Sequence, residues 1–168
     1  MSKNSINWYF HTDNNLLYYD NRSLAERFPE KDKRWKDWKT GGSEGIKSIL
    51  RGNIETKIHN AHILNRHLLS CDGFGRIKTV NGIITNDSDH YYNYIDHYWA
   101  KSTEEFVNKL AKGSVAVGFN VSHAMRRINI YFSFCDLNLD KINYIENKTK
   151  LNLTEFRLKL HNKKNMTN

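Results

Sequence analysis

The sequence predicts an α/β domain in which a small mixed sheet is flanked by helices, and three features indicate this. Residues 6–10 are aromatic and β-branched, which is typical of a short strand. Residues 102–105 read Ser-Thr-Glu-Glu, a capping box in which serine and glutamate side chains satisfy backbone amides at a helix start. Apolar residues at helical spacing follow it, and Gly113 is a typical helix end.

Further elements are predicted along the first half of the chain. Residues 24–28 form a helical turn that ends at Pro29, and residues 46–50 form a second strand. Between them, residues 30–45 are charged and contain glycine, with Trp35 and Trp38 among them. Because tryptophans in a surface loop favour binding over packing, we expect a binding loop there.

The second half carries four more signals. Tyrosines spaced three or four apart predict a helix over residues 91–98, and the alternation of Ile128, Ile130, Phe132 and Phe134 predicts a strand. The tail after residue 137 is predicted to hold two helices, with frayed residues 161–168. We therefore divide the chain into a domain of residues 1–136 and a basic helical tail of residues 137–168.

The composition limits the class of protein and its partners. The 168 residues are 39% hydrophobic and 26% charged, which indicates a globular chain. The formal net charge of +8 favours polyanionic partners such as nucleic acid, anionic lipid headgroups or nucleotide diphosphates. The two cysteines form no metal-type spacing, and no signal peptide or apolar run of membrane-spanning length occurs. These features predict a cytoplasmic protein, which can also lie peripherally at a membrane.

Several short motifs occur in a fixed order and carry a resemblance to a known family. They are residues 7–10 (Asn-Trp-Tyr-Phe), 24–28 (Leu-Ala-Glu-Arg-Phe), 47–51 (Lys-Ser-Ile-Leu-Arg), 62–63, 72–75 and the long segment 95–113. The series resembles the C-terminal half of the family 2-like and family 92-like glycosyltransferases. In those proteins the last motif reads I-N-H-Y-x-T-K-S-x-E-E-F-x-x-K-x-x-R-G. The resemblance covers residues 6–113.

The resemblance implies a partial GT-A fold that transfers a sugar from a nucleotide-sugar donor to a glycan or lipid-linked acceptor. It also implies a divalent metal, manganese or magnesium, shared with an N-terminal half that supplies the donor site. Developing charge on the nucleotide diphosphate is stabilised by a metal, a lysine or backbone amides. The amides and the dipole at the start of the helix predicted after Ser102 favour a phosphate. By motif position His62 is the first metal ligand and His97 the second, while Trp8, Lys101 and Ser102 bind substrate.

The chain departs from the family in two places. The nucleotide-binding first half is missing, so we expect a truncated form or a split subunit that pairs with a separate N-terminal half. The Asp87-Ser88-Asp89 motif is placed as a turn or helix cap rather than as the family's metal motif. Residues 11–15 replace the family's glycine-serine turn, and Asp13 is the candidate for the catalytic base.

Two alternatives remain. The charge and the interleaved aromatic residues also suit a basic nucleic-acid-binding module, whose affinity would fall steeply with salt. The chain could instead be a non-catalytic remnant of a transferase. A zinc cluster of His59, His62, His67 and Cys71 is disfavoured, because the spacing matches no common zinc pattern.

Overall fold

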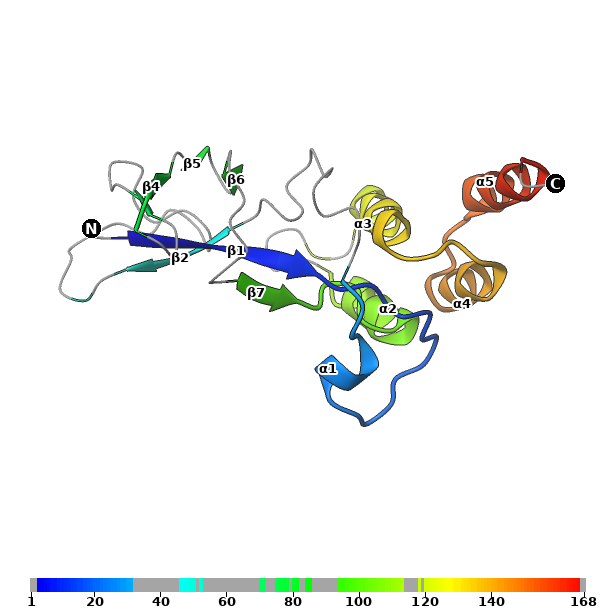
Figure 1. The fold of residues 1–168 in the computed structure, drawn as a ribbon. Coiled ribbons are helices and arrows are strands. Elements are labelled where there is room, and N and C mark those ends of the chain that lie inside the picture. Colours follow the sequence, from blue (N-terminus) through cyan, green and yellow to red (C-terminus); the bar gives the residue numbers. More distant parts are fainter. Residues whose placement is uncertain are drawn as a thin grey trace. The chain divides into compact units, whose positions relative to one another are not determined.

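The computed structural model describes residues 3–31, 46–50, 52, 70–71, 75–78, 80–81, 84–85, 94–113, 118 and 120–166. The chain forms two compact units. The strand unit comprises Met1–Phe10 and Lys31–His97, and the helical unit comprises His11–Glu30 and Tyr98–Asn168. All described strands belong to the first unit and all described helices to the second (Figure 1). A mixed α/β composition is thus confirmed, while the GT-A assignment stays a prediction.

The strand unit is built around β1 (Lys3–Phe10), as Figure 1 shows. β2 (Ile46–Leu50) pairs with β1 in antiparallel direction, and β7 (Tyr94–His97) pairs with it in parallel direction over residues 7–10. The expected strands at residues 6–10 and 46–50 are confirmed. The remaining short strands are β3 (Ser70–Cys71, parallel to β1), β4 (Ile77–Lys78), β5 (Val80–Asn81) and β6 (Ile84–Thr85).

The predicted helix over residues 91–98 is wrong for its described part, because residues 94–97 form strand β7. Each of them has a β1 partner, from Asn7 opposite Tyr94 to Phe10 opposite His97. Exposed and half-buried residues alternate along β7, which is the period of a strand. Pairing with an existing strand therefore outweighs the helical spacing of the tyrosines.

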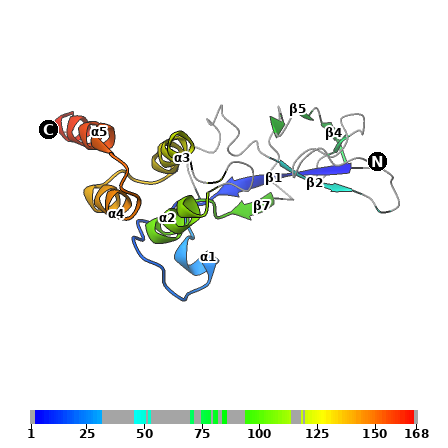
Figure 2. The ribbon, with the colours of Figure 1, turned by 180° about the vertical axis from the view of Figure 1, so that it is seen from behind.

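Within its described residues the helical unit contains five helices, seen from behind in Figure 2. α1 (Leu24–Arg27) and α2 (Thr103–Ala111) both begin with a complete capping box, and Gly113 follows α2 at a positive φ of 68°. The helices predicted at these two places are confirmed. The others are α3 (Val121–Phe134), α4 (Leu139–Thr149) and α5 (Thr154–Asn165), the last of which is helical further than expected.

The expected strand at residues 128–134 is wrong, because these residues belong to α3. Asn120 caps the helix by accepting a hydrogen bond from the His123 amide, so the chain enters residue 128 already helical. The buried positions of α3 are Ala124, Ile128, Tyr131 and Phe134, spaced four, three and three. That spacing defines one helix face, and the alternating apolar residues coincide with it only in part.

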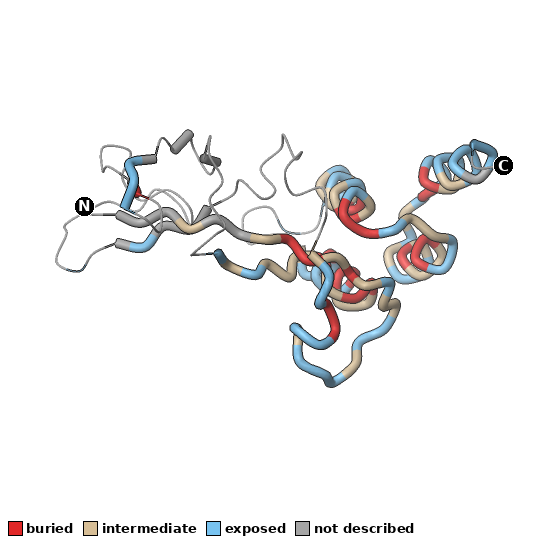
Figure 3. Tube along the Cα trace, in the orientation of Figure 1, coloured by how far each residue is buried: buried red, intermediate tan, exposed pale blue. Residues whose placement is uncertain are grey.

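The core of the helical unit lies between these helices, where the buried segments coloured in Figure 3 are found. Phe106 of α2 stacks on Tyr131 of α3, with ring centroids 4.2 Å apart. The fully buried side chains of α4 and α5 complete the core: Ile142, Ile145 and Phe156, with Leu153 from the connection. Burying such side chains stabilises the fold by about 1.5–3 kcal/mol each.

The helices α4 and α5 belong to the same compact unit as α2 and α3. The domain boundary expected after residue 136 stays a prediction. Among the described residues, no helix is long and apolar enough to cross a membrane.

Candidate functional site: a basic aromatic pocket and a buried ion pair

Asp13, the expected catalytic base, is buried and ion-paired in the helical unit. Its side chain is 2% exposed, and its Oδ2 atom lies 2.6 Å from Nζ of Lys141, which is itself 1% exposed. The Tyr131 hydroxyl donates to the same oxygen at 2.6 Å, and the Asn15 amide donates to Oδ1 at 3.1 Å. Both carboxylate oxygens thus accept hydrogen bonds from the protein.

Further polar groups extend this ion pair into a network. Lys141 Nζ also donates to Oδ1 of Asn15 at 2.8 Å and to the carbonyl of Asp136 at 3.1 Å, which uses all three ammonium hydrogens. The Tyr131 and Thr103 hydroxyls lie 2.9 Å apart. Burial, and then the charge of Asp13, raise the pKa of Tyr131 above its ordinary value. The network therefore joins the segment after β1 to α2, α3 and α4.

This geometry is that of a buried structural ion pair. A general base needs a lone pair within reach of the proton that it removes. In this structure the Asp13 carboxylate faces a lysine and a tyrosine, with almost no exposure to solvent. The catalytic role of Asp13 stays a prediction.

The start of α2 carries two further expected residues, Lys101 and Ser102. Ser102 is buried, and its hydroxyl accepts from the Glu105 amide at 3.3 Å and lies 2.9 Å from Oε2 of Glu105. Lys101 precedes the cap at a positive φ of 57°. Such a conformation is uncommon for a residue with a Cβ atom.

The amides of the first turn of α2 all have protein acceptors. Thr103 donates to the carbonyl of Leu16 and Glu104 to that of Leu17, both at 3.0 Å. Glu105 donates to the Ser102 hydroxyl and Phe106 to the Ser102 carbonyl. The sequence led us to expect phosphate binding by these amides. Because they already donate to protein acceptors, an anion at this place would have to be bound by nearby side chains.

Those side chains line a pocket of about 460 Å³ in the helical unit. Its lining residues come from the segment before α2, from α2 itself, and from Tyr19: Tyr19, Trp99, Ala100, Lys101, Glu105, Asn108, Lys109 and Lys112. Three lysines and two aromatic rings are therefore gathered around one cavity. This volume falls within the range of pockets that hold small ligands.

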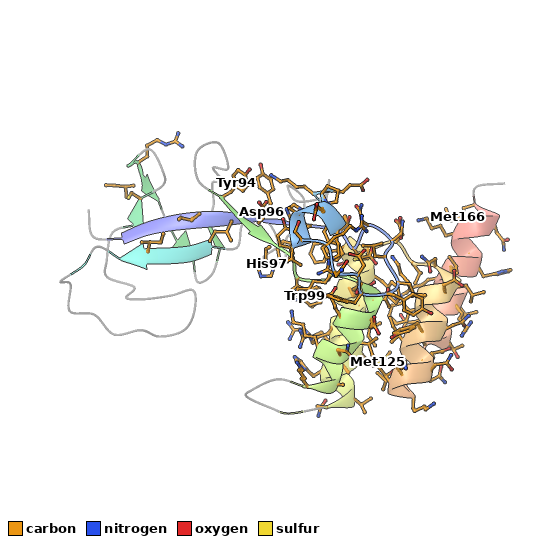
Figure 4. The ribbon with its side chains drawn as sticks, turned by 90° about the horizontal axis from the view of Figure 1, so that it is seen from below. Tyr94, Asp96, His97, Trp99, Met125 and Met166 are labelled. Atoms are coloured by element: carbon orange, nitrogen blue, oxygen red, sulfur yellow. The ribbon has the colours of Figure 1, made fainter. Side chains whose placement is uncertain are left out.

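Trp99, labelled in Figure 4, lies next to two cationic side chains. Lys109 Nζ lies 5.1 Å from the Trp99 ring centroid and the Arg127 guanidinium 5.7 Å from it. The indole also packs against Phe106, with centroids 5.7 Å apart. Cations within about 6 Å of an indole face are attracted by its quadrupole.

The pocket is electrostatically positive. Partial burial, then repulsion from Arg127 and Lys101, lowers the pKa of Lys109 to about 8. The one carboxylate lining the pocket, Glu105, is shared: it binds Arg27 at 2.7 Å and lies 3.8 Å from Lys101. Burial alone would raise the pKa of Glu105, but hydrogen bonds from Arg27 and Ser102 lower it. A carboxylate held in this way compensates the lysines only in part.

The remaining expected residues belong to the strand unit. His97 ends β7, and its ring lies 4.8 Å from that of Phe10, centroid to centroid. Trp8 lies in β1, opposite Ile95. His62 lies outside the described residues, as do the Asp87-Ser88-Asp89 motif and the tryptophans at 35 and 38.

The described residues do not by themselves form a metal site. In this part of the chain, no group of three His, Cys, Asp or Glu side chains is arranged to hold a metal ion. Because the first expected ligand lies outside the described residues, the divalent metal stays a prediction.

Sequence reasoning did not single out Lys109, Lys112, Trp99 and Arg127 as site residues, nor Lys141 and Tyr131 as partners of Asp13. Lys109, Lys112 and Trp99 lie in the motif of residues 95–113, so the motif could have indicated them as site residues. Lys141 and Tyr131 lie more than a hundred residues from Asp13, and no local pattern connects them.

Comparison with known proteins gives no match: no protein-family model, no curated protein and no solved structure is significantly similar to this chain.

Proposed function

We propose that the chain is the acceptor-side part of a glycosyltransferase and that the basic aromatic pocket binds the diphosphate of a nucleotide-sugar donor. The observation that carries this proposal is the clustering of Lys101, Lys109 and Lys112 around one cavity beside Trp99. The sugar then passes to a glycan or lipid-linked acceptor.

The pocket is lined by the same motif that carries the resemblance. Trp99, Lys101, Glu105, Lys109 and Lys112 all fall within residues 95–113 and all face this cavity. Four of these positions, all but Trp99, match charged positions of the family pattern K-S-x-E-E-F-x-x-K-x-x-R. The residue types fixed by the motif are therefore the ones that line the cavity.

The charge of the pocket favours a polyanion of small size. Lysine ammonium groups bind phosphate oxygens by charge-assisted hydrogen bonds, each worth about 1.5–3 kcal/mol. A bound diphosphate would also relieve the repulsion among Lys101, Lys109 and Arg127, which lowers the pKa of Lys109. In a transferase the same cations would stabilise the charge that develops on the leaving diphosphate.

The divalent metal is part of this proposal, with His62 and His97 as its ligands from this chain. Imidazole nitrogen is a common ligand for such ions, and acidic ligands would come from a separate N-terminal half. Such an ion would supply Lewis-acid chemistry. The lysines of the pocket orient the diphosphate, and this role does not require the metal.

The direct test is calorimetric titration of the full chain with uridine diphosphate and guanosine diphosphate, with and without manganese. We expect binding in wild type and a loss of roughly tenfold or more in Lys101→Ala/Lys109→Ala, since two charge-assisted bonds are removed. Lys148→Ala, an exposed lysine of α4, is the matched control and should bind as wild type does. A further loss in His62→Ala that appears only with manganese would support the metal assignment.

Two outcomes would count against the proposal. Equal diphosphate affinity of wild type and the double variant would show that the pocket is not the binding site. Tighter binding of a short single-stranded oligonucleotide than of either diphosphate, with a steep salt dependence, would favour the nucleic-acid-binding alternative.

A further inference from the structure

A second cluster, in the strand unit, surrounds the ammonium group of Lys31. Lys31 Nζ lies 4.1 Å from the ring centroid of Tyr9 and 4.1 Å from that of Tyr94. It also lies 3.8 Å from Oδ1 of Asp96. One cation is thus held by two aromatic faces and one carboxylate.

The register of the sheet builds this arrangement. Tyr9 of β1 is paired with Asp96 of β7, and Tyr94 lies two residues before Asp96 on the same strand. Because side chains two apart in a strand share a face, Tyr94 and Asp96 point to the same side, as Figure 4 allows the reader to follow. The two tyrosine rings are nearly perpendicular, at 78°, with centroids 4.9 Å apart.

Two perpendicular rings with a carboxylate form a cage for a weakly hydrated cation. Aromatic faces attract any cation, and quaternary ammonium groups are the ligands that proteins typically bind in this way. A lysine ammonium is a compact and strongly hydrated charge, so it loses more hydration in such a cage than a trimethylammonium group does.

The side chain of Lys31 is partly exposed to solvent and can leave this position. Its side chain is 37% exposed and that of Asp96 is 39% exposed, so water screens their attraction. Tyr94 is 44% exposed, which leaves the cage open to solvent on its side. A ligand from solution can therefore compete with the lysine for the same rings.

We propose that Tyr9, Tyr94 and Asp96 form a binding site for a quaternary ammonium group of the choline type, and that Lys31 occupies this site until the ligand displaces it. The two rings supply cation–π contacts and the Asp96 carboxylate balances the charge. This inference concerns the strand unit and is independent of the pocket around Trp99.

The test uses the full chain and choline enriched with carbon-13 in its methyl groups, observed by NMR. On binding, the aromatic rings should shift the methyl resonance upfield. We expect weak binding in wild type and an affinity about fivefold higher in Lys31→Ala, because the internal competitor is removed. The higher choline affinity should be lost again in the double variants Lys31→Ala/Asp96→Asn and Lys31→Ala/Tyr94→Leu.

Controls separate this site from general effects of charge and of folding. Lys148→Ala should leave choline binding unchanged, and circular dichroism should show that each variant is folded. The neutral isostere 3,3-dimethyl-1-butanol should not compete, since it lacks the charge. Competition by phosphatidylcholine vesicles, but not by phosphatidylglycerol vesicles, would show that the site also accepts a lipid headgroup, whereas binding of free choline alone restricts it to small molecules.

The proposal is overturned if Lys31→Ala shows no upfield shift, if the neutral isostere competes equally, or if the Tyr94→Leu double variant binds choline as well as Lys31→Ala does.

Discussion

Replacing Lys141 by methionine tests whether the buried ion pair holds the helical unit together. The change keeps the length of the side chain but removes three donated hydrogen bonds, to Asp13, Asn15 and the carbonyl of Asp136. Asp13 is then left as a buried carboxylate without a cationic partner, although the Tyr131 hydroxyl, the backbone amide of Asn15 and the Cys135 thiol still form hydrogen bonds with it.

The expected loss is large relative to the stability of a domain. Removing one partner of a buried ion pair costs about 3–5 kcal/mol, because the other charge remains without compensation. Domains are stable by only about 5–15 kcal/mol, so Lys141→Met should lose between about a fifth and all of that stability. The double variant Asp13→Asn/Lys141→Met removes both charges and should be destabilised by less than the sum of the single changes, with a coupling of about 1–3 kcal/mol.

Urea unfolding followed by circular dichroism at 222 nm is the suitable assay, because the described helices all belong to the unit that contains the pair. Lys148→Met serves as the matched control, since Lys148 lies on the same helix but is exposed. If Lys141→Met and Lys148→Met were destabilised equally, or if the two single losses of the pair were additive, the ion pair would not contribute as argued.

Three further predictions concern the pocket and the ends of α2. Below pH 8 Lys109 is protonated and binds an anion, so diphosphate affinity should fall above pH 8 in wild type but not in Lys109→Arg; identical pH profiles in calorimetry would contradict this. Ser102→Ala removes the cap of α2 and should cost about 1 kcal/mol in urea unfolding, while Ser133→Ala on exposed α3 surface should cost less. Gly113→Ala places a Cβ at φ 68° and should cost about 1–2 kcal/mol, and an unchanged unfolding midpoint would refute the strain argument.

The sequence predicted the elements whose signals are local. The capping box at Ser102 and Glu105 is made within one turn, so residue types alone specify it, and the structure confirms both reciprocal hydrogen bonds. The strand at residues 6–10 was predictable for the same reason, since its residues are aromatic and β-branched, and the helix around Ile142 was predictable from its apolar spacing.

Two assignments were wrong, and for the first of them a distant strand decides the structure. The tyrosines before residue 98 have helical spacing, yet residues 94–97 pair with β1, a strand nearly ninety residues earlier in the chain. In α3 the alternation of Ile128, Ile130, Phe132 and Phe134 imitates a strand, while the burial of Ile128, Tyr131 and Phe134 follows the helix. Periodicity over seven residues does not separate the two cases.

The site was only partly predictable for a related reason. The motif placed Lys101 beside α2, and Lys101 does line the pocket. The same motif also suggested free helix amides for a phosphate, but the carbonyls of Leu16 and Leu17 already accept from them. These carbonyls come from a segment more than eighty residues away, so no reading of the motif alone could have found them.

Three lysines in three environments show why the net charge of +8 says little about function. Lys141 is fully buried and its three hydrogens are bound by protein acceptors, so its charge contributes to structure and is closed to ligands. Lys109 lies beside an indole, and its pKa is lowered first by burial and then by the charges of Arg127 and Lys101. Lys31 lies between two tyrosines and a carboxylate, where we propose that a quaternary ammonium group replaces it. Since burial and neighbours differ while the side chain is the same, the number of lysines does not by itself say which of them are available to an anion.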